Sequence, residues 1–441
     1  MNFKRIIFLL SIVTLLLFPA FADEGSAIDY GANVEIGAES FIENGDPVSY
    51  QMISLDPDMA FGKFGIGISL TFHYKFSGND GSFDFREEDW IPDDKRSALD
   101  IYLPILRYFR YGHKGDSLYG KIGYIDDGTL GNGFIMGNYS NTHFLPERKI
   151  IGLSLDMDGN LFNFPYLGIE TFFGNLAKMD VFGTRLYARP LVALNLPVFK
   201  DLQIGLTAAF DRNPNSFKNF LTVDEGDIST VSIFGVDFKQ PVLSNDLISM
   251  AIFGDTAFQN GGDKVAAGSL LGFGGNIFTF MNYGLNALFL GDNFVPFYFD
   301  SSYDLFREQK FLVYNETNQI PGYAGWRASM GFTFADSLFV FNASIDGAFV
   351  QNELTPFPHL IATFVVGEGL IPGFSFDASY DKRDIETFSD LINAENAVIG
   401  ANINYKTGPA VITLGYDLRY APESEKGWET TAKLSTSISL F

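Results

Sequence analysis

The side chains that most often perform acid–base or metal chemistry are few and widely separated in this sequence. The four histidines are His73, His113, His143 and His359, and there is no cysteine. No two histidines have the spacing that puts metal ligands on one helix face or in one hairpin. Without cysteine there is no thiolate metal site, no cysteine nucleophile and no disulfide framework. We therefore expect no metal and no other cofactor.

One pair of carboxylates near a histidine is the best candidate for catalysis. Asp126 and Asp127 follow a predicted strand, and His143 lies further along the same connection. Acid–base catalysis needs groups that converge on one substrate atom. Adjacent residues of a strand point to opposite faces, so the two carboxylates are not expected to act together. No Gly-x-Ser-x-Gly motif is present, and we expect a protein that is not an enzyme.

Two further patterns imitate ligand-binding loops. Asp156-x-Asp158-Gly159 matches the start of a calcium loop, but the other oxygen ligands and the closing glutamate are missing, so a tight turn is the better interpretation. Glycines crowd positions 123–137 without the helix and the basic residue that a phosphate loop requires. We expect an ordinary outer loop there; a loop that folds inward as a constriction is the alternative.

The charge balance is strongly acidic. Lys and Arg total 30 against 53 Asp and Glu, a formal net charge of −23. Nucleic-acid binding needs a basic surface, so nucleic acid is not an expected partner. Much of the negative charge falls in the predicted loops 77–98 and 381–396, where it would attract cations. The first of these loops contains the outer-loop acidic cluster that we predict, Asp80, Asp84, Glu87, Glu88 and Asp89.

The first 22 residues have the pattern of a secretory signal peptide. Lys4 and Arg5 precede an apolar run from Ile6 to Phe18, and Ala20-x-Ala22 offers a cleavage site. A retained membrane anchor is the alternative, but the run is shorter than the roughly 20 residues that span a bilayer. We predict a cleaved signal peptide over 1–22 and one domain over 23–441. The mature domain has 28 basic and 53 acidic residues, a formal charge of −25.

The positions of all these groups depend on a repeat of two residues. From Phe64 to Phe76 every even position is apolar, and every odd position is glycine or polar. Such alternation predicts a strand with one apolar face. The same alternation recurs over 28–39, 202–211, 397–405 and 412–420.

These predicted strands are long and continue along the whole chain. The run over 64–76 exceeds the usual 5–6 residues of a soluble strand, whereas a tilted strand needs about 9–11 to cross a bilayer. A soluble β-sandwich protein of this length would normally show linkers between domains. The sequence therefore predicts an all-β fold, a single closed antiparallel up-and-down barrel in a membrane.

The connections between predicted strands differ in length. Tight turns at 158–160, 335–337 and 406–409 alternate with long gaps such as 127–148, 212–227, 301–325 and 381–396. Membrane barrels have short turns at one end and long outer loops at the other. With both chain ends at the short-turn end the strand number is even, and we predict about 20 strands within a range of 16–20.

The last segment, Leu434 to Phe441, resembles the closing strand of bacterial outer-membrane barrels, whose terminal phenylalanine is read by the assembly machinery. Here the apolar set is Leu434, Thr436, Ile438 and Leu440, opposite to the usual register from Phe441. The segment Tyr119–Tyr124 and its continuation to Phe134 is similar to segments of uncharacterised outer-membrane proteins. The architecture resembles porin-like outer-membrane barrels. That resemblance implies a Gram-negative-type outer membrane, with membrane lipid, the assembly machinery and small solutes as partners and a homo-oligomer as a possibility.

A barrel of about 20 strands is too wide for side chains to fill. The leading functional prediction is a passive pore for small hydrophilic solutes, possibly cation-preferring. Two alternatives stay open, a fatty-acid-type transporter for hydrophobic substrates and a surface adhesin. The pore-lining residues that we predict are Glu35, His73, Lys75, Asp417 and Arg419.

Overall fold

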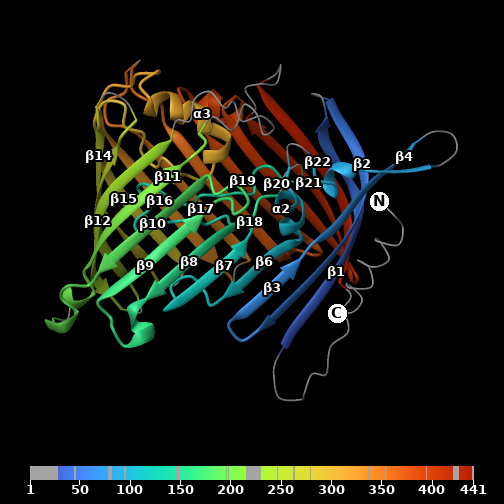
Figure 1. Ribbon diagram of the computed structural model, residues 1–441, viewed down its shortest axis with the longest axis horizontal. Coiled ribbons are helices and arrows are strands. Elements are labelled where there is room, and N and C mark those ends of the chain that lie inside the picture. The colour runs from blue at the N-terminus through green and yellow to red at the C-terminus, as the bar shows by residue number, and fades with distance from the viewer. Residues whose placement is uncertain are drawn as a thin grey trace.

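The computed structural model contains one closed antiparallel sheet. It describes residues 28–439 except 44–45, 78–81, 94–95, 146–148, 195, 197, 215–229, 246, 262–263, 279, 336–337, 353, 394 and 421–426. The predicted signal peptide, Asp80 and Phe441 lie outside the described residues. The first strand pairs with the second and also with the last, which closes the sheet into a barrel. Figure 1 shows the strands running obliquely around it, with β1, β2 and β22 together at one side.

The strands have the following bounds: β1 Ile28–Glu43, β2 Asp46–Phe61, β3 Phe64–Ile68, β4 Leu70–Ser77, β5 Ser82–Phe85, β6 Leu106–Tyr111, β7 Leu118–Gly123, β8 Gly152–Asp158, β9 Leu167–Phe173, β10 Val181–Ala188, β11 Gln203–Asp211, β12 Val231–Ser244, β13 Ser249–Gln259, β14 Ala266–Ile277, β15 Met281–Leu290, β16 Tyr323–Phe334, β17 Phe339–Ala348, β18 His359–Ile371, β19 Phe374–Lys382, β20 Ala397–Thr407, β21 Ala410–Tyr420 and β22 Trp428–Ser439. The helices are α2 Ala98–Tyr102 and α3 Tyr303–Tyr314, with short 3-10 turns at η1 Glu87–Asp89, η2 Leu103–Ile105, η3 Gly159–Phe162, η4 Val192–Leu194, η5 Phe199–Asp201 and η6 Phe388–Ile392.

These strands make a barrel of 20 positions. β3 and β4 together occupy one position, because both pair with β2 and are separated only at Ser69. β5 pairs with β4 and extends the wall at its far end. The prediction of one strand over 64–76 is therefore corrected by this interruption, and the predicted number of 20 is confirmed.

The apolar face of each strand points outward and forms a belt around the barrel. Leu206 of β11 is 61% exposed, whereas its neighbour Thr207 points inward and is buried. The last strand follows the same rule, because Leu434 is 55% exposed and Ser435 is 2% exposed. Leu434 and Ile438 of its apolar set therefore face outward. Other members of the belt are Ile36, Leu186, Phe234, Leu271, Phe289 and Leu414.

Most short connections lie at the end where β1 begins and β22 ends. They include 62–63, 335–338, 372–373 and 408–409, while the opposite end carries the long connections. We call the first the terminal end and the second the loop end. Two connections break the rule, since 189–202 is long and 44–45 is short. None of the helices in the described part of the chain is long and apolar enough to cross a membrane.

A charge placed in the belt tests its contact with lipid. Leu206→Arg should lower the free energy of unfolding in vesicles by about 2–4 kcal/mol, the cost of a basic side chain near the bilayer centre. Urea titration of wild type and variant measures this difference. Leu206→Ile serves as the matched control and should differ little, and an arginine variant as stable as wild type would contradict the assignment of this face.

Candidate functional site

Two long connections at the loop end fold into the barrel. Residues 124–151 join β7 to β8, and residues 291–322 join β15 to β16 and contain α3. Their apolar side chains form one buried cluster with inward residues of the wall, such as Ala209 and Ile233. The expectation of an ordinary outer loop around the glycines is therefore wrong, and so is the expectation of an outer loop over 301–325. We call these two connections the inner segments.

The inner segments also bind each other through their backbones. The Phe297 amide donates to the Phe134 carbonyl at 3.1 Å, and the Phe299 amide donates to the Ile135 carbonyl at 3.0 Å. In return, the Gly137 amide donates to the Phe299 carbonyl at 3.0 Å. This short parallel pairing satisfies backbone groups that the barrel wall does not reach.

Buried charges hold α3 against the wall. The Arg307 guanidinium lies 2.5 Å from the Asp211 carboxylate of β11 and 3.2 Å from Asp180. The Tyr303 hydroxyl donates to Asp211 at 2.6 Å. Removing one partner of a buried ion pair is strongly destabilising, because the other charge is left without compensation. These contacts therefore fix the position of the helix.

A neighbouring carboxyl on the same helix is in a different state. The Tyr139 hydroxyl of the first inner segment lies 2.9 Å from both oxygens of Asp304. Burial raises the pKa of the Asp304 carboxyl to about 7. A protonated Asp304 adds no third negative charge to a site that already holds Asp180 and Asp211.

A second ion-pair group ties α3 to β19 and its following loop. Lys310 and Arg383 each lie 2.7 Å from the Asp300 carboxylate. Burial lowers the pKa of Lys310 to about 8, although Asp300 favours its charged form. On the adjacent strand, His359 lies 2.7 Å from Asp381. These groups neutralise one another beside the remaining open space.

That space is a cavity of about 1380 Å³ between the inner segments and the wall of β12–β18. Strand register places its wall residues in cross-strand rows. One row contains Asn282, Gly331, Asn342 and Thr363, which pair in that order across β15–β18. The rows above it continue with Gly284, Ser329 and Ser344, and then with Phe253, Gly272, Asn286, Arg327 and Asp346. We call this surface the amide wall.

The charges around the cavity balance. Among its described lining residues four are basic and four are acidic, apart from His359. The net charge of −23 is therefore not concentrated here. The basic residues are Lys239, Lys310, Arg327 and Arg383, and the acidic ones are Asp126, Asp300, Asp346 and Asp384.

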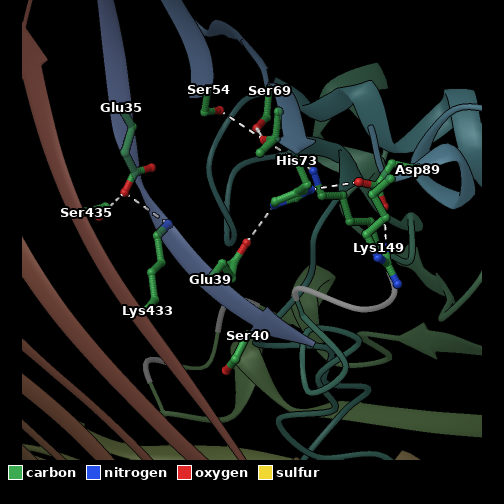
Figure 2. A network of polar contacts seen from close by, with 12 residues as sticks. Glu35, Glu39, Ser40, Ser54, Ser69, His73, Asp89, Lys149, Lys433 and Ser435 are labelled. Carbon is green, nitrogen blue, oxygen red and sulfur yellow. Dashed lines mark hydrogen bonds and ion pairs between the residues drawn. The ribbon is translucent and has the colours of Figure 1, made fainter. Parts of the chain in front are cut away.

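The five predicted pore-lining residues lie elsewhere in the barrel, and none of them is among the described residues that line this cavity. Figure 2 shows His73 between two carboxylates, with Nδ1 2.7 Å from Asp89 and Nε2 2.9 Å from Glu39. Glu35 accepts a hydrogen bond from Ser435 and lies 3.0 Å from Lys433.

The other three predicted residues contact neighbours near the same part of the wall. Lys75 donates to the Tyr50 hydroxyl at 3.4 Å, and Arg419 lies 2.9 Å from Glu429. Asp417 pairs in register with Gly400 and is exposed.

The predicted acidic cluster is partly neutralised. Arg86 lies between Glu88, Asp89 and Glu43, with its guanidinium 2.9 Å from Glu88 and 3.5 Å from Glu43. Asp84 and Glu87 are exposed, and Asp84 pairs in register with Lys75. This loop therefore offers less free negative charge than its composition suggests.

The candidate catalytic residues are held by different partners. Asp126 lies 3.8 Å from Lys121, whereas His143 Nε2 contacts the Ser301 carbonyl at 2.5 Å. Asp158, from the calcium-like pattern, binds Tyr187 at 2.7 Å and Arg189, and a 3-10 turn follows it. Across the described residues, no group of three or more His, Asp or Glu side chains is placed to hold a metal ion.

Sequence reasoning missed α3 and the amide wall. One signal for the helix was available, since residues 303–314 contain neither glycine nor proline, unlike the long gaps 127–148 and 212–227. The wall had a signal too, because Asn282, Gly284 and Asn286 alternate with Tyr283 and Leu285. What places both beside one cavity is the pairing of distant strands.

The protonation of Asp304 predicts a pH dependence. Its carboxyl titrates near pH 7 in the fold, against about 3.9 when unfolded. Between these values only the folded state keeps the proton, so the contribution of Asp304 is complete below pH 4 and is lost as pH rises through 7. The wild-type unfolding free energy, measured relative to Asp304→Asn by urea titration in detergent, should therefore fall from pH 4 to pH 8. A difference that does not change with pH would refute a buried protonated carboxyl here.

No protein-family model matches the chain, and no curated protein is significantly similar to it. Among solved structures, Pseudomonas aeruginosa OccK2 (OpdF) in complex with glucuronate is 11% identical, with a TM-score of 0.34 over 94% of this chain and 99% of that chain. Pseudomonas aeruginosa OpdL is 7% identical, with a TM-score of 0.34 over 94% and 99%.

A mutant of Rh. blastica porin is 9% identical, with a TM-score of 0.28 over 94% of this chain and 100% of that chain. The likeness to porin-like outer-membrane barrels as a class rests on the closed barrel and its apolar belt.

Proposed function

We propose that this protein is an outer-membrane channel for passive diffusion of small hydrophilic solutes. The observation that carries the proposal is the cavity of about 1380 Å³ inside a closed barrel, lined on one side by the amide wall. The inner segments narrow the lumen, and their buried apolar cluster includes wall residues from β9 to β15. Barrels of this strand number leave an aqueous interior unless it is plugged.

The apolar belt supports a location in the bacterial outer membrane, with lipid and the barrel-assembly machinery as partners. The predicted pore-lining role of Glu35, His73, Lys75, Asp417 and Arg419 remains part of the proposal, as does a homo-oligomer. Cation preference rests only on the overall acidic charge, because the lining of the cavity is balanced. Charge at the mouth can still attract cations to it.

The two alternatives have less support. A transporter for hydrophobic substrates needs a continuous apolar route, whereas the lining of the cavity mixes apolar side chains such as Phe253 with polar ones such as Asn282 and Asn342. An adhesin would use the long loops 77–98, 301–325 and 381–396, but α3 occupies much of the second and is buried inside the barrel.

Conductance in a planar bilayer tests the proposal. The mature chain, refolded in detergent and shown to be folded by its heat-modifiable migration, should give stable current steps. The reversal potential across a KCl gradient measures cation preference in the same recording. A folded barrel that never conducts would overturn the channel, and a conducting barrel with a reversal potential near zero would overturn only the cation preference.

The first inner segment should limit the current. Deletion of residues 129–140 removes the part that pairs with residues 297–299 and lies beside the cavity, so single-channel conductance should rise. Deletion of the η6 residues 388–392, whose Phe388 and Ile392 are exposed and which are absent from the described lining of the cavity, is the matched control and should leave the conductance unchanged. An unchanged conductance in the 129–140 deletion would show that this segment is no constriction.

A further inference from the structure

We propose that the amide wall is a binding site for neutral saccharides, so that the solutes of this channel include oligosaccharides. This inference rests on the proposed channel function and specifies its solute class. A sugar ring has an apolar C–H face and a rim of hydroxyls, each of which donates and accepts hydrogen bonds. Its recognition therefore requires paired donors and acceptors beside an apolar surface.

An amide donor, Asn282 Nδ2, and an amide acceptor, Asn342 Oδ1, lie next to each other over the Gly331 backbone. A β-carbon at this position would lie 2.4 Å from Asn282 Nδ2 and 2.4 Å from Asn342 Oδ1. The glycine therefore leaves the room in which two amides from strands on either side converge. A donor next to an acceptor matches two neighbouring hydroxyls of a sugar. The other end of the Asn342 amide is oriented by Thr363 Oγ1, at 3.5 Å.

The apolar surface lies in another row of the same wall. Phe253 is half-buried and lines the cavity, and Gly272 separates it from Asn286. Asn286 Oδ1 is buried and has no hydrogen-bond partner in the described part of the chain. An unpaired buried acceptor costs free energy, and a solute hydroxyl reaches this one only when the Asn286 side chain turns away from Gly272, where a β-carbon would lie 1.9 Å from Oδ1. The half-buried Phe253 ring is the part of this row that a ligand contacts directly.

The charged groups of the cavity favour a neutral ligand over an ionic one. Asp300 already pairs with Lys310 and Arg383 at 2.7 Å. The Arg327 guanidinium stacks 4.0 Å from the centre of the Phe297 ring and donates to Ser344 at 3.2 Å. The lining also offers a solute amides, hydroxyls and apolar side chains such as Phe253 and Met330.

The cavity has room for such a ligand. At about 1380 Å³ it exceeds the roughly 300–1,000 Å³ of pockets that hold drug-sized molecules. A trisaccharide can therefore lie along the wall while water and ions pass beside it. Partial reduction of the ion current is the expected signal.

The experiment measures current block by maltotriose in planar bilayers, with polyethylene glycol of equal hydrodynamic size as a probe that lacks the hydroxyl rim. Maltotriose should reduce the wild-type current more than the polymer does. Asn282→Ala and Phe253→Ala should each weaken the block about five-fold, as expected for loss of one hydrogen bond or ring contact. Asn404→Ala is the matched control, since Asn404 faces inward on β20 and is absent from the described lining of the cavity. Maltotriose should reduce the current through this variant as much as it does in wild type.

A subtler variant tests the geometry. Gly331→Ala keeps both asparagines but places a methyl group between them, so it should also weaken the block. The saccharide site would be overturned, and the channel retained, by either of two results. One is an equal reduction of the wild-type current by maltotriose and the polymer, and the other is a block by maltotriose that is as strong in the variants as in wild type. A folded barrel that does not conduct would overturn the channel. The saccharide site is then tested by saturation-transfer NMR of maltotriose with the detergent-solubilised chain. Transfer that Asn282→Ala reduces would support the site, and the absence of transfer would overturn it.

Discussion

The constraint on which this structure depends is the need to satisfy every backbone hydrogen bond of a sheet that faces lipid. An open sheet would leave two unpaired edges, and the hydrocarbon offers nothing to pair with them. The pairing of β1 with β22 removes both edges. Closure with 20 strand positions then creates an interior wider than side chains from the wall can fill. The remaining features of the molecule are responses to that interior.

One sector of the interior is filled by the inner segments. They carry their own apolar residues, which pack against Phe172, Val181 and other inward side chains. Arg307 and its two carboxylate partners add specificity of position, because any displacement would separate charges in a dry environment. Asp304 avoids a third negative charge nearby by keeping its proton. The filled sector is therefore held by both apolar packing and buried polar contacts.

The other sector stays open, and polar residues line it together with apolar ones. Glycines such as Gly272, Gly284 and Gly331 alternate with asparagine and serine across the strands, so the longer side chains lie over glycine backbone and do not crowd one another. The result is a wall whose hydrogen-bonding groups face the cavity. Where charged residues line this cavity, Asp300 pairs with both Lys310 and Arg383.

Much of the fold could be predicted from the sequence. The alternation of residues decides which face of each strand meets lipid, and this pattern is local, so the strands over 397–405 and 412–420 and the outward face of Leu434 followed from it. The number of strands followed in turn from the spacing of turns. The break at Ser69 did not, because it depends on the different neighbours of β3 and β4.

The candidate site was decided by tertiary structure. The sequence showed that residues 127–148 and 301–325 are long connections. Polar residues, glycines and short helices occur both in loops outside a barrel and in segments folded inside it, so composition does not distinguish the two. Their position depends on partners distant in sequence, Arg307 with Asp211 and Phe134 with Phe297, which no local pattern reveals. The sequence by itself therefore determined a closed barrel with a polar inner face, because lipid imposes a strict rule on every strand. Only the tertiary structure decided which part of that inner face borders the open cavity, because the inner segments are held by partners distant in sequence.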